Sequence, residues 1–318
     1  MLGLLGKGNF GHVYKAVVVE DYGIPSYLAA VKMLRQDNIA AVDDALKEAA
    51  LMAQFENAFV VGLIGVVTVE QPLLVIIEYC EHGALSIYLK RNNLSNSEKT
   101  LMAADCAEGL AYLAANRFIH RDVAARNVLV SSELRGKISD FGMSRKLDPA
   151  TDYTTSTGVS LPVRWSAPET LELSRFSEQS DVWSFGVLMW EIWSKADMPF
   201  KALDSNSAVW NAITGGQRLQ CPPGCPSAAY DVMRSCWNTC GERPAFSTLV
   251  PLLRGLDVSD EPSDSGMPVS DVSTQVTVVA GYFNARLESS QSSVSIGSNS
   301  TKYEEFVKEG PLMQTTDV

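Results

Sequence analysis

The sequence predicts an α+β protein in which a small strand-rich part with one helix precedes a larger, mainly helical part. Residues 1–80 are rich in strand-forming residues, and residues 81–256 show helical periodicity and helix-capping signals. The segment 257–318 differs, with twelve serines, no Trp or Cys, and ten acidic against three basic residues. This composition indicates a disordered, acidic, Ser-rich tail.

The strand-rich part contains three clear strand patterns and one amphipathic helix. Residues 27–34, 60–69 and 73–79 are dominated by β-branched and other apolar residues. Between them, residues 42–55 place Ala45, Ala49 and Met52 at i, i+4 and i+7. That spacing predicts a helix with one buried face.

The helical part begins with a strong N-terminal signal. Ser95 and Glu98 have the spacing of a capping box, and a stripe of apolar residues follows it, namely Met102, Cys106, Leu110 and Leu113. Residues 180–194 are apolar on nearly all sides, which predicts a fully buried helix.

Bulk composition excludes several classes of protein. The net charge of −11 disfavours a nucleic-acid binder, which usually carries a basic face. No apolar run approaches the length of a membrane span, and the N-terminus lacks the pattern of a signal peptide. Two C-x₃-C pairs, Cys221/Cys225 and Cys236/Cys240, leave zinc binding as an alternative to free thiols in a reducing compartment. We expect a cytoplasmic protein or the intracellular part of a truncated receptor.

A glycine-rich string near the N-terminus, Gly6-Lys7-Gly8-Asn9-Phe10-Gly11, matches G-x-G-x-x-G. Glycines allow the backbone to approach phosphate oxygens closely. A dinucleotide-binding loop has the same string but leads into a helix, whereas residues 12–17 read as a strand. The sequence therefore favours a hairpin that covers a nucleotide.

A lysine and a glutamate are expected to pair next to this hairpin. Ala30 and Lys32 share one face of the strand 27–34 because strand side chains alternate. Glu48 is the one charged residue on the apolar stripe of the helix 42–55. A buried carboxylate requires a cation, and Lys32 is the candidate.

Two further strings point to phosphoryl transfer. Residues 120–127 read His-Arg-Asp-Val-Ala-Ala-Arg-Asn, and Asp140-Phe141-Gly142 follows at short distance. Ala167-Pro168-Glu169 completes an ordered set with the glycine-rich string and Lys32. Over roughly residues 2–255 the chain resembles the protein tyrosine kinase family. The resemblance implies a two-lobed protein kinase fold with an ATP cleft between the lobes, as a domain over 1–256 with lobes 1–80 and 81–256.

The resemblance also implies roles for individual residues, with ATP and Mg²⁺ as cofactors. Asp122 would accept the substrate hydroxyl proton, Lys32 would bridge Glu48 and the ATP phosphates, and Asn127 and Asp140 would bind Mg²⁺. The residues expected around the nucleotide are Leu5, Gly6, Gly8, Gly11, Val13, Ala30, Glu78, Cys80 and Leu129, with Ile77 at the back of the adenine pocket.

The catalytic loop favours tyrosine as the acceptor. Serine/threonine kinases usually place a lysine two residues after the catalytic Asp, whereas this chain has Ala124 there and Arg126 two residues later. Pro162 and Trp165 resemble the substrate platform of tyrosine kinases. A tyrosine hydroxyl extends farther from its backbone, so a flat apolar surface such as Pro162 suits it.

Regulatory and structural roles are implied in the same way. Tyr153 would be an activation-loop phosphorylation site, with Arg121 and Arg145 placed to pair with its phosphate. Three further residues resemble structural ones: Asp181 would brace the catalytic loop, and Glu169 and Arg243 would form a buried pair.

The tail contains three short motifs that suggest partners other than tyrosine-containing protein substrates. Tyr282 and Tyr303 lie in sequences that resemble ligands of phosphotyrosine-reading adaptors. The end of the chain, Thr316-Asp317-Val318, resembles a PDZ-domain ligand.

Alternatives remain at this point. A pseudokinase scaffold, catalytically weak or inactive, would usually lack Lys32, Asp122, Asn127 or Asp140, all of which are present. A serine/threonine or dual-specificity kinase is disfavoured by Ala124 and Arg126. Because the chain starts close to the glycine-rich string, we also expect the first strand to be clipped.

Overall fold

The structure is a computed structural model that describes residues 1–8, 11–19, 25–34, 39–69, 72–146, 153–154 and 161–258. The chain divides into two units, Met1–Asp264 and Ser265–Val318, and all described residues belong to the first. The three tail motifs lie outside the described residues.

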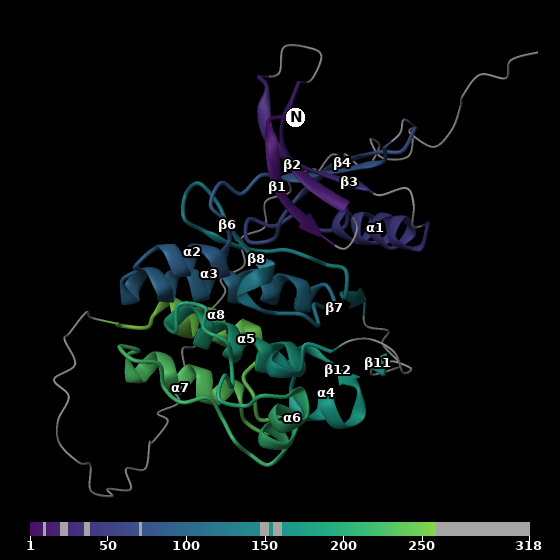
Figure 1. The fold of residues 1–318 in the computed structure, drawn as a ribbon. Helices are drawn as coiled ribbons and strands as arrows, with labels where there is room; N and C mark the ends of the chain where they lie inside the picture. Colours follow the sequence, from purple (N-terminus) through teal and green to yellow (C-terminus); the bar gives the residue numbers. More distant parts are fainter. Residues whose placement is uncertain are drawn as a thin grey trace, which may run out of the picture. The chain divides into compact units, whose positions relative to one another are not determined.

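The N-terminal lobe is an antiparallel five-stranded sheet with one helix (Figure 1). Its strand order is β1-β2-β3-β5-β4, where the strands are β1 (Gly3–Gly8), β2 (Gly11–Val18), β3 (Tyr27–Leu34), β4 (Leu63–Val67) and β5 (Leu74–Glu78). β1 pairs with β2 from Gly3 opposite Lys15 to Gly8 opposite Gly11, with one register shift, and the expectation of a clipped first strand stays a prediction.

Helix α1 (Ile39–Met52) packs on β4 and β5 through its predicted apolar face. Ala45, Ala49 and Met52 are all buried, and the first two cluster with Leu34 and Val75. The helix begins three residues earlier than predicted and ends at Met52, after which the chain continues in turns through Phe55. Burial of this stripe fixes the angular position of Glu48.

The C-terminal lobe is mainly helical and begins after β5. Its longer elements are α2 (Leu85–Arg91), α3 (Asn96–Ala115), α4 (Pro168–Leu173), α5 (Glu178–Trp193), α6 (Asn206–Thr214), α7 (Ser227–Cys236) and α8 (Phe246–Arg254). Short strands complete it: β6 (Gly83–Ala84), β7 (Phe118–Ile119), β8 (Val128–Val130), β9 (Gly136–Ile138), β10 (Arg145–Lys146), β11 (Tyr153–Thr154) and β12 (Arg175–Phe176).

The two predictions for helices in this lobe are confirmed. Ser95 and Glu98 form the capping box of α3, and the stripe that starts at Met102 is buried. Helix α5 is the central helix of the lobe, with Val182, Phe185 and Leu188 fully enclosed. Burial on all sides is what an apolar helix without a polar face requires.

The loop that precedes β4 joins the two lobes. Predicted as the start of a strand, residues 60–62 instead pair with β9: the Ile138 N–H donates to the Phe59 carbonyl (2.8 Å), and the Val61 N–H donates to the Ile138 carbonyl (2.9 Å). Gly109 of α3 allows this approach, because a Cβ there would lie 2.5 Å from the Phe59 oxygen.

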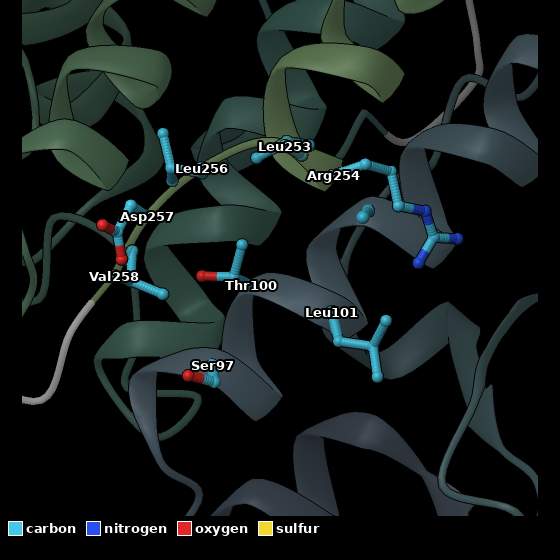
Figure 2. A pocket seen from close by; sticks show the side chains of 9 residues that line it. Ser97, Thr100, Leu101, Leu253, Arg254, Leu256, Asp257 and Val258 are labelled. Atoms are coloured by element: carbon cyan, nitrogen blue, oxygen red, sulfur yellow. The ribbon is translucent and has the colours of Figure 1, made fainter.

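Helix α8 is tied to α3 by a buried carboxylate. Asp105, fully buried, accepts from Arg135 (2.7 and 2.6 Å) and from Arg254 (2.9 Å) at the end of α8. Arg254, Leu256 and Val258 line a cavity of about 330 Å³ against Thr100 of α3 (Figure 2). The chain past α8 thus remains part of the folded lobe up to Val258, which is buried.

No helix among the described residues is both long and apolar enough to span a membrane.

Candidate active site

Residues 120–127, which we call the catalytic loop, lie between β7 and β8. Asp181 of α5 binds the backbone of this loop. The Asp181 carboxylate accepts the backbone N–H groups of His120 (2.6 Å) and Arg121 (2.9 Å). Burial raises the pKa of Asp181, and the charge of His120 together with these hydrogen bonds opposes that shift. Asp181 therefore braces the catalytic loop, as predicted.

The Asp122 carboxylate is held on both oxygens. Arg126 donates to Oδ1, and the Asn127 amide donates to Oδ2 (2.7 Å) and to the Asp122 carbonyl (2.8 Å). Charge-assisted bonds of this kind fix an acidic side chain in one rotamer. The half-buried carboxylate is thereby oriented before any substrate arrives.

Asn127 also links the catalytic loop to the segment that carries Asp140. Its carbonyl accepts from the Ser139 N–H (2.9 Å) and hydroxyl (2.8 Å), so the two segments are held adjacent. Asp140 has a left-handed backbone (φ 62°) and an exposed side chain. Hard divalent cations prefer carboxylate and amide oxygens, so the donor set of Asn127 and Asp140 fits Mg²⁺.

Lys32 and Glu48 form the predicted pair. Lys32 Nζ lies 2.9 Å from Glu48 Oε2, and the side chains are only 18% and 9% exposed. Glu48 lines a cavity of about 480 Å³ together with Phe141 and Gly142, the neighbours of Asp140. Glu48 of the small lobe and the neighbours of Asp140 in the large lobe therefore face the same cavity.

The glycine-rich string forms the expected hairpin between β1 and β2 and does not lead into a helix. Asn9 and Phe10 lie outside the described residues. Gly11 has a further reason to be glycine: at φ 150° a Cβ would lie 1.9 Å from the Met33 carbonyl oxygen of β3. A Cβ added at Gly6 would meet no atom within 4 Å, and the phosphate-binding role of Gly6 and Gly8 stays a prediction.

The residues predicted around adenine lie on adjoining strands and on β8. Ala30 is paired with Ile77, and Val13 with Lys32, so these positions are neighbours in the sheet. Ala30 and Cys80 are buried, Leu129 is half-buried on β8, and Leu5 is exposed. Burial raises the pKa of the Cys80 thiol to about 12, and the charge of Glu78 adds to this.

Glu78 has a side-chain role that the sequence did not predict. Its carboxylate pairs with Lys137 of β9 (2.6 Å) and accepts the Gly62 N–H (3.2 Å). These bonds join the end of β5 in the small lobe to β9 in the large lobe, beside the chain segment that joins β5 to β6. The backbone role expected of Glu78 stays a prediction.

The substrate side of the loop is built around Trp165. The Arg126 guanidinium lies 4.4 Å from the Trp165 ring centroid, and Trp165 Nε1 donates to Glu191 Oε2 (3.0 Å). The same Glu191 oxygen accepts the Ala125 N–H (2.8 Å). Pro162 is half-buried directly before the turn that contains Trp165.

Glu191 is the site residue that the sequence prediction missed. It is 5% exposed and lies on α5, where burial raises its pKa and the hydrogen bonds from Ala125 and Trp165 oppose that shift. The sequence did contain a signal for Glu191, because a carboxylate within an otherwise apolar helix requires hydrogen-bond partners, as argued for Glu48.

The backbone around Tyr153 forms a short ladder near Arg121. Tyr153 pairs with Phe176 across β11 and β12, and the Arg121 guanidinium lies 3.9 Å from the Phe176 ring centroid. Arg145 is exposed on β10 and donates to the Ser144 carbonyl (2.7 Å). The Tyr153 side chain lies outside the described part of the chain, so its pairing with Arg121 and Arg145 stays a prediction.

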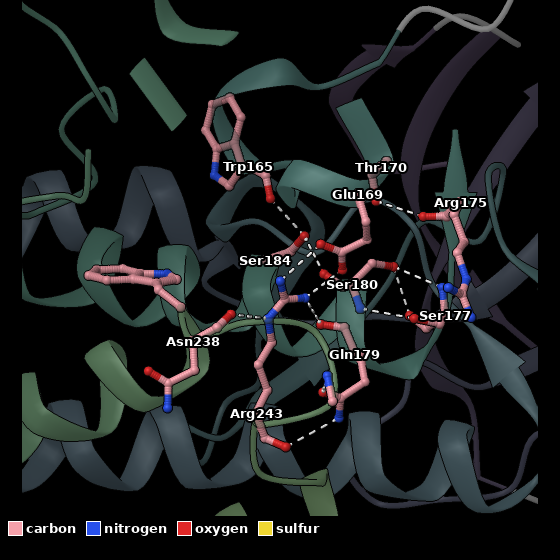
Figure 3. A network of polar contacts seen from close by, with 12 residues as sticks. Trp165, Glu169, Thr170, Arg175, Ser177, Gln179, Ser180, Ser184, Asn238 and Arg243 are labelled. Carbon is pink, nitrogen blue, oxygen red and sulfur yellow. Dashed lines mark hydrogen bonds and ion pairs between the residues drawn. The ribbon is translucent and has the colours of Figure 1, made fainter. Parts of the chain in front are cut away.

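The pair of Glu169 and Arg243 is confirmed as a buried, two-pronged ion pair (Figure 3). The two guanidinium nitrogens bind the two carboxylate oxygens at 2.6 and 2.9 Å, and Arg243 also donates to the Gln179 and Asn238 carbonyls. This network anchors α4, and with it the segment containing Trp165, to the lobe.

All six cysteines are free thiols, and the described residues contain no cluster of three or more His, Cys, Asp or Glu side chains that could hold a metal ion.

Comparisons with known proteins agree with this geometry. Residues 1–253 match the family model described as protein tyrosine and serine/threonine kinase. The chain is 41% identical over 249 residues to Tyrosine-protein kinase Abl of Drosophila melanogaster, which covers 77% of this chain and 15% of that protein. It is 44% identical over 256 residues to Ephrin type-A receptor 7 of Gallus gallus, covering 79% of this chain and 26% of the receptor.

The aligned region is therefore a minor part of both relatives, whereas it makes up most of this chain. The five strings, the two-lobed architecture, the oriented Asp122 and the match over residues 1–253 lead to one conclusion: the chain belongs to the protein tyrosine and serine/threonine kinase family.

Proposed function

We propose that the chain transfers the terminal phosphoryl group of ATP to tyrosine hydroxyls of protein substrates and requires Mg²⁺. The observation that carries this proposal is the Asp122 carboxylate, oriented on both oxygens by Arg126 and Asn127. A carboxylate held in this way can accept the proton of a hydroxyl nucleophile. Mg²⁺, when bound, would neutralise charge on the phosphates.

The remaining roles are proposed from one ion pair and from the kinds of residue at the other positions. Lys32, kept in place by Glu48, supplies a positive charge for phosphate oxygens. Asn127 and Asp140 supply oxygen ligands for the metal. Leu5, Val13, Ala30 and Leu129 supply apolar surface for adenine, and Cys80 supplies backbone hydrogen bonds.

The contact of Arg126 with Trp165 supports tyrosine as the acceptor. The guanidinium touches both the base, Asp122, and the ring that flanks the substrate side. Because Arg126 separates the flat ring of Trp165 from the base Asp122, a substrate chain resting on this ring needs a long side chain to reach Asp122. Tyrosine has such a side chain and serine does not. The name of one relative, Tyrosine-protein kinase Abl, agrees with this choice.

The test uses the whole chain, Mg-ATP, and two peptides that differ only in a tyrosine or a serine acceptor. We expect phosphate on the tyrosine peptide alone. Asp122→Asn should lower kcat by about 10³-fold while ATP still raises the melting temperature, because the base contributes to chemistry more than to nucleotide binding. ATP binding without transfer by the wild-type chain would instead support the scaffold alternative.

Phosphorylation of Tyr153 is proposed as the activating event. Its phosphate would add nearly two negative charges beside Phe176, over which Arg121 lies. Tyr153→Phe should lower activity while ATP binding remains. Equal activity of this variant and of a wild-type sample phosphorylated at Tyr153 would reject the proposal.

The motifs at Tyr282, Tyr303 and the C-terminus are proposed as partner sites on sequence grounds alone. Binding of phosphorylated and unphosphorylated tail peptides to phosphotyrosine-reading domains would test the two tyrosines, and equal binding of the two forms would reject them.

A further inference from the structure

Two thiols that the proposed phosphoryl transfer does not use lie together in the loop between α6 and α7. Cys221 is exposed and Cys225 is half-buried. Cys221 Sγ lies 3.9 Å from the Cys225 carbonyl oxygen. The Cys221 thiol therefore lies against the backbone of Cys225 before any oxidation takes place.

The backbone between these thiols is already folded back on itself. The Cys225 N–H donates to the Pro222 carbonyl (3.1 Å), which closes a turn over residues 222–225. Pro222 and Pro223 restrict φ, and Gly224 supplies the left-handed conformation (φ 72°). Little further conformational entropy would be lost in joining the two sulfurs.

The chain on either side of the turn is anchored as well. The Gln220 carbonyl accepts from Trp190 Nε1 (2.8 Å) of α5, and the Leu219 carbonyl accepts from the Tyr230 hydroxyl (2.8 Å) of α7. Cys225 is followed by Pro226, the N-cap residue of α7. The thiols are thus held by the folded lobe as well as by their spacing in sequence.

We propose that Cys221 and Cys225 are a modification site, at which a disulfide-type oxidant such as oxidised glutathione forms an intrachain disulfide. Exposed Cys221 reacts first: its thiolate attacks one sulfur of the oxidant and releases one glutathione thiolate. The Cys225 thiolate then attacks the Cys221 sulfur and releases the second. Both thiol protons pass to the two glutathione thiolates, so two cysteines are oxidised and one oxidant molecule is reduced.

The second step has a distinct pH dependence. In the reduced chain, burial, with the charge and hydrogen bond of Cys221, raises the pKa of the Cys225 thiol to about 12, and burial, the largest of these causes, still raises that pKa in the mixed disulfide. The thiolate fraction of Cys225 therefore increases about tenfold per pH unit in the range below that pKa. The rate at which the mixed disulfide with glutathione converts to the Cys221–Cys225 disulfide should rise with pH in proportion to this thiolate fraction.

The chain contains a matched control with the same spacing. Cys236 and Cys240 are also separated by three residues, but Cys236 is fully buried at the end of α7 and Cys240 is exposed. An external oxidant can reach Cys240, whereas Cys236 is enclosed in the core. The structure therefore predicts a disulfide in the first pair and none in the second.

The experiment equilibrates the folded full chain with oxidised and reduced glutathione, blocks free thiols and digests the chain with trypsin. Cleavage after Arg218 and Arg234 places Cys221 and Cys225 in one peptide, 219–234, and the control pair in the next. We expect peptide 219–234 to lose the mass of two hydrogen atoms and to escape alkylation. Its equilibrium constant for oxidation should exceed that of the urea-unfolded chain by about tenfold.

Two variants complete the test. Cys225→Ser should stop at a glutathione adduct on Cys221, and Cys221→Ser should leave Cys225 largely unmodified. The proposal is overturned if peptide 219–234 remains fully alkylatable in the folded wild type, if both pairs oxidise equally, or if folding confers no advantage over the unfolded chain. Because the readout is peptide mass, it is independent of kinase activity.

Discussion

Glu191 Oε2 accepts two hydrogen bonds, from Trp165 Nε1 on the substrate side and from the Ala125 N–H in the catalytic loop, and thereby joins these segments to the central helix α5. Glu191→Ala would leave both donors without this acceptor inside the protein. We expect a loss of about 1–3 kcal/mol in unfolding free energy and about tenfold in kcat.

Glu191→Gln is the conservative partner variant, because an amide oxygen can accept the same two bonds. It should recover most of both losses, as measured by thermal unfolding and by steady-state kinetics on a tyrosine peptide. An alanine variant with the kinetics of wild type would show that Glu191 does not position the loop.

The ion pair between Lys32 and Glu48 leads to a second prediction. Glu48→Gln removes the charge that holds Lys32 and should lower kcat/KM for ATP by about 10–100-fold, or roughly 1.4–2.8 kcal/mol. Asp44→Asn is the control, because Asp44 is an exposed acid on the same helix. Equal effects of the two variants would contradict a specific role for Glu48.

A third prediction concerns Gly109. Alanine is usually favoured over glycine within a helix by about 1 kcal/mol. At Gly109 the added Cβ would lie 2.5 Å from the Phe59 oxygen and 2.9 Å from Ile138, so Gly109→Ala should lower the unfolding free energy by about 2 kcal/mol. Gly65→Ala, where a Cβ has open space, should change it far less in the same denaturant titration.

The buried thiol of Cys236 should make stability depend on alkaline pH. Burial raises its pKa to about 12, whereas an unfolded cysteine titrates near about 8.5. Below about pH 8.5 both states are protonated; above it the unfolded state loses its proton first, so unfolding free energy falls by up to about 1.4 kcal/mol per pH unit. The loss continues until the folded pKa is reached.

Chemical denaturation at pH 7–10 would measure this effect. The stability gap between wild type and Cys236→Ala should narrow as the pH rises, because the variant lacks the titrating thiol. Cys240→Ala, at an exposed position, serves as the control and should remain parallel to wild type. A constant gap for Cys236→Ala would contradict the assignment.

Periodicity and local chemistry were sufficient to predict the elements that positioned the site. Burial of Ala45, Ala49 and Met52 determined where Glu48 points, and a carboxylate on that face required Lys32. The short strings then supplied Asp122, Asn127 and Asp140. The helix and its ion pair could be predicted because the apolar stripe left one charged position that required a partner, whereas the roles of Asp122, Asn127 and Asp140 stay predictions.

Contacts between distant segments were harder to predict. Residues 60–62 read as a strand in isolation, yet the loop they belong to pairs with β9 and closes the lobe junction. Glu78 and Lys137 pair across the same junction, and no local pattern distinguishes such a pair from exposed charges.

The bond between Arg254 and Asp105 has a practical consequence for recombinant expression. The family match ends at residue 253, and a fragment cut there would lack the guanidinium that helps neutralise a fully buried carboxylate. It would also lack Val258, which is buried beside α3. A fragment intended for crystallisation or enzymology should therefore extend through at least Val258.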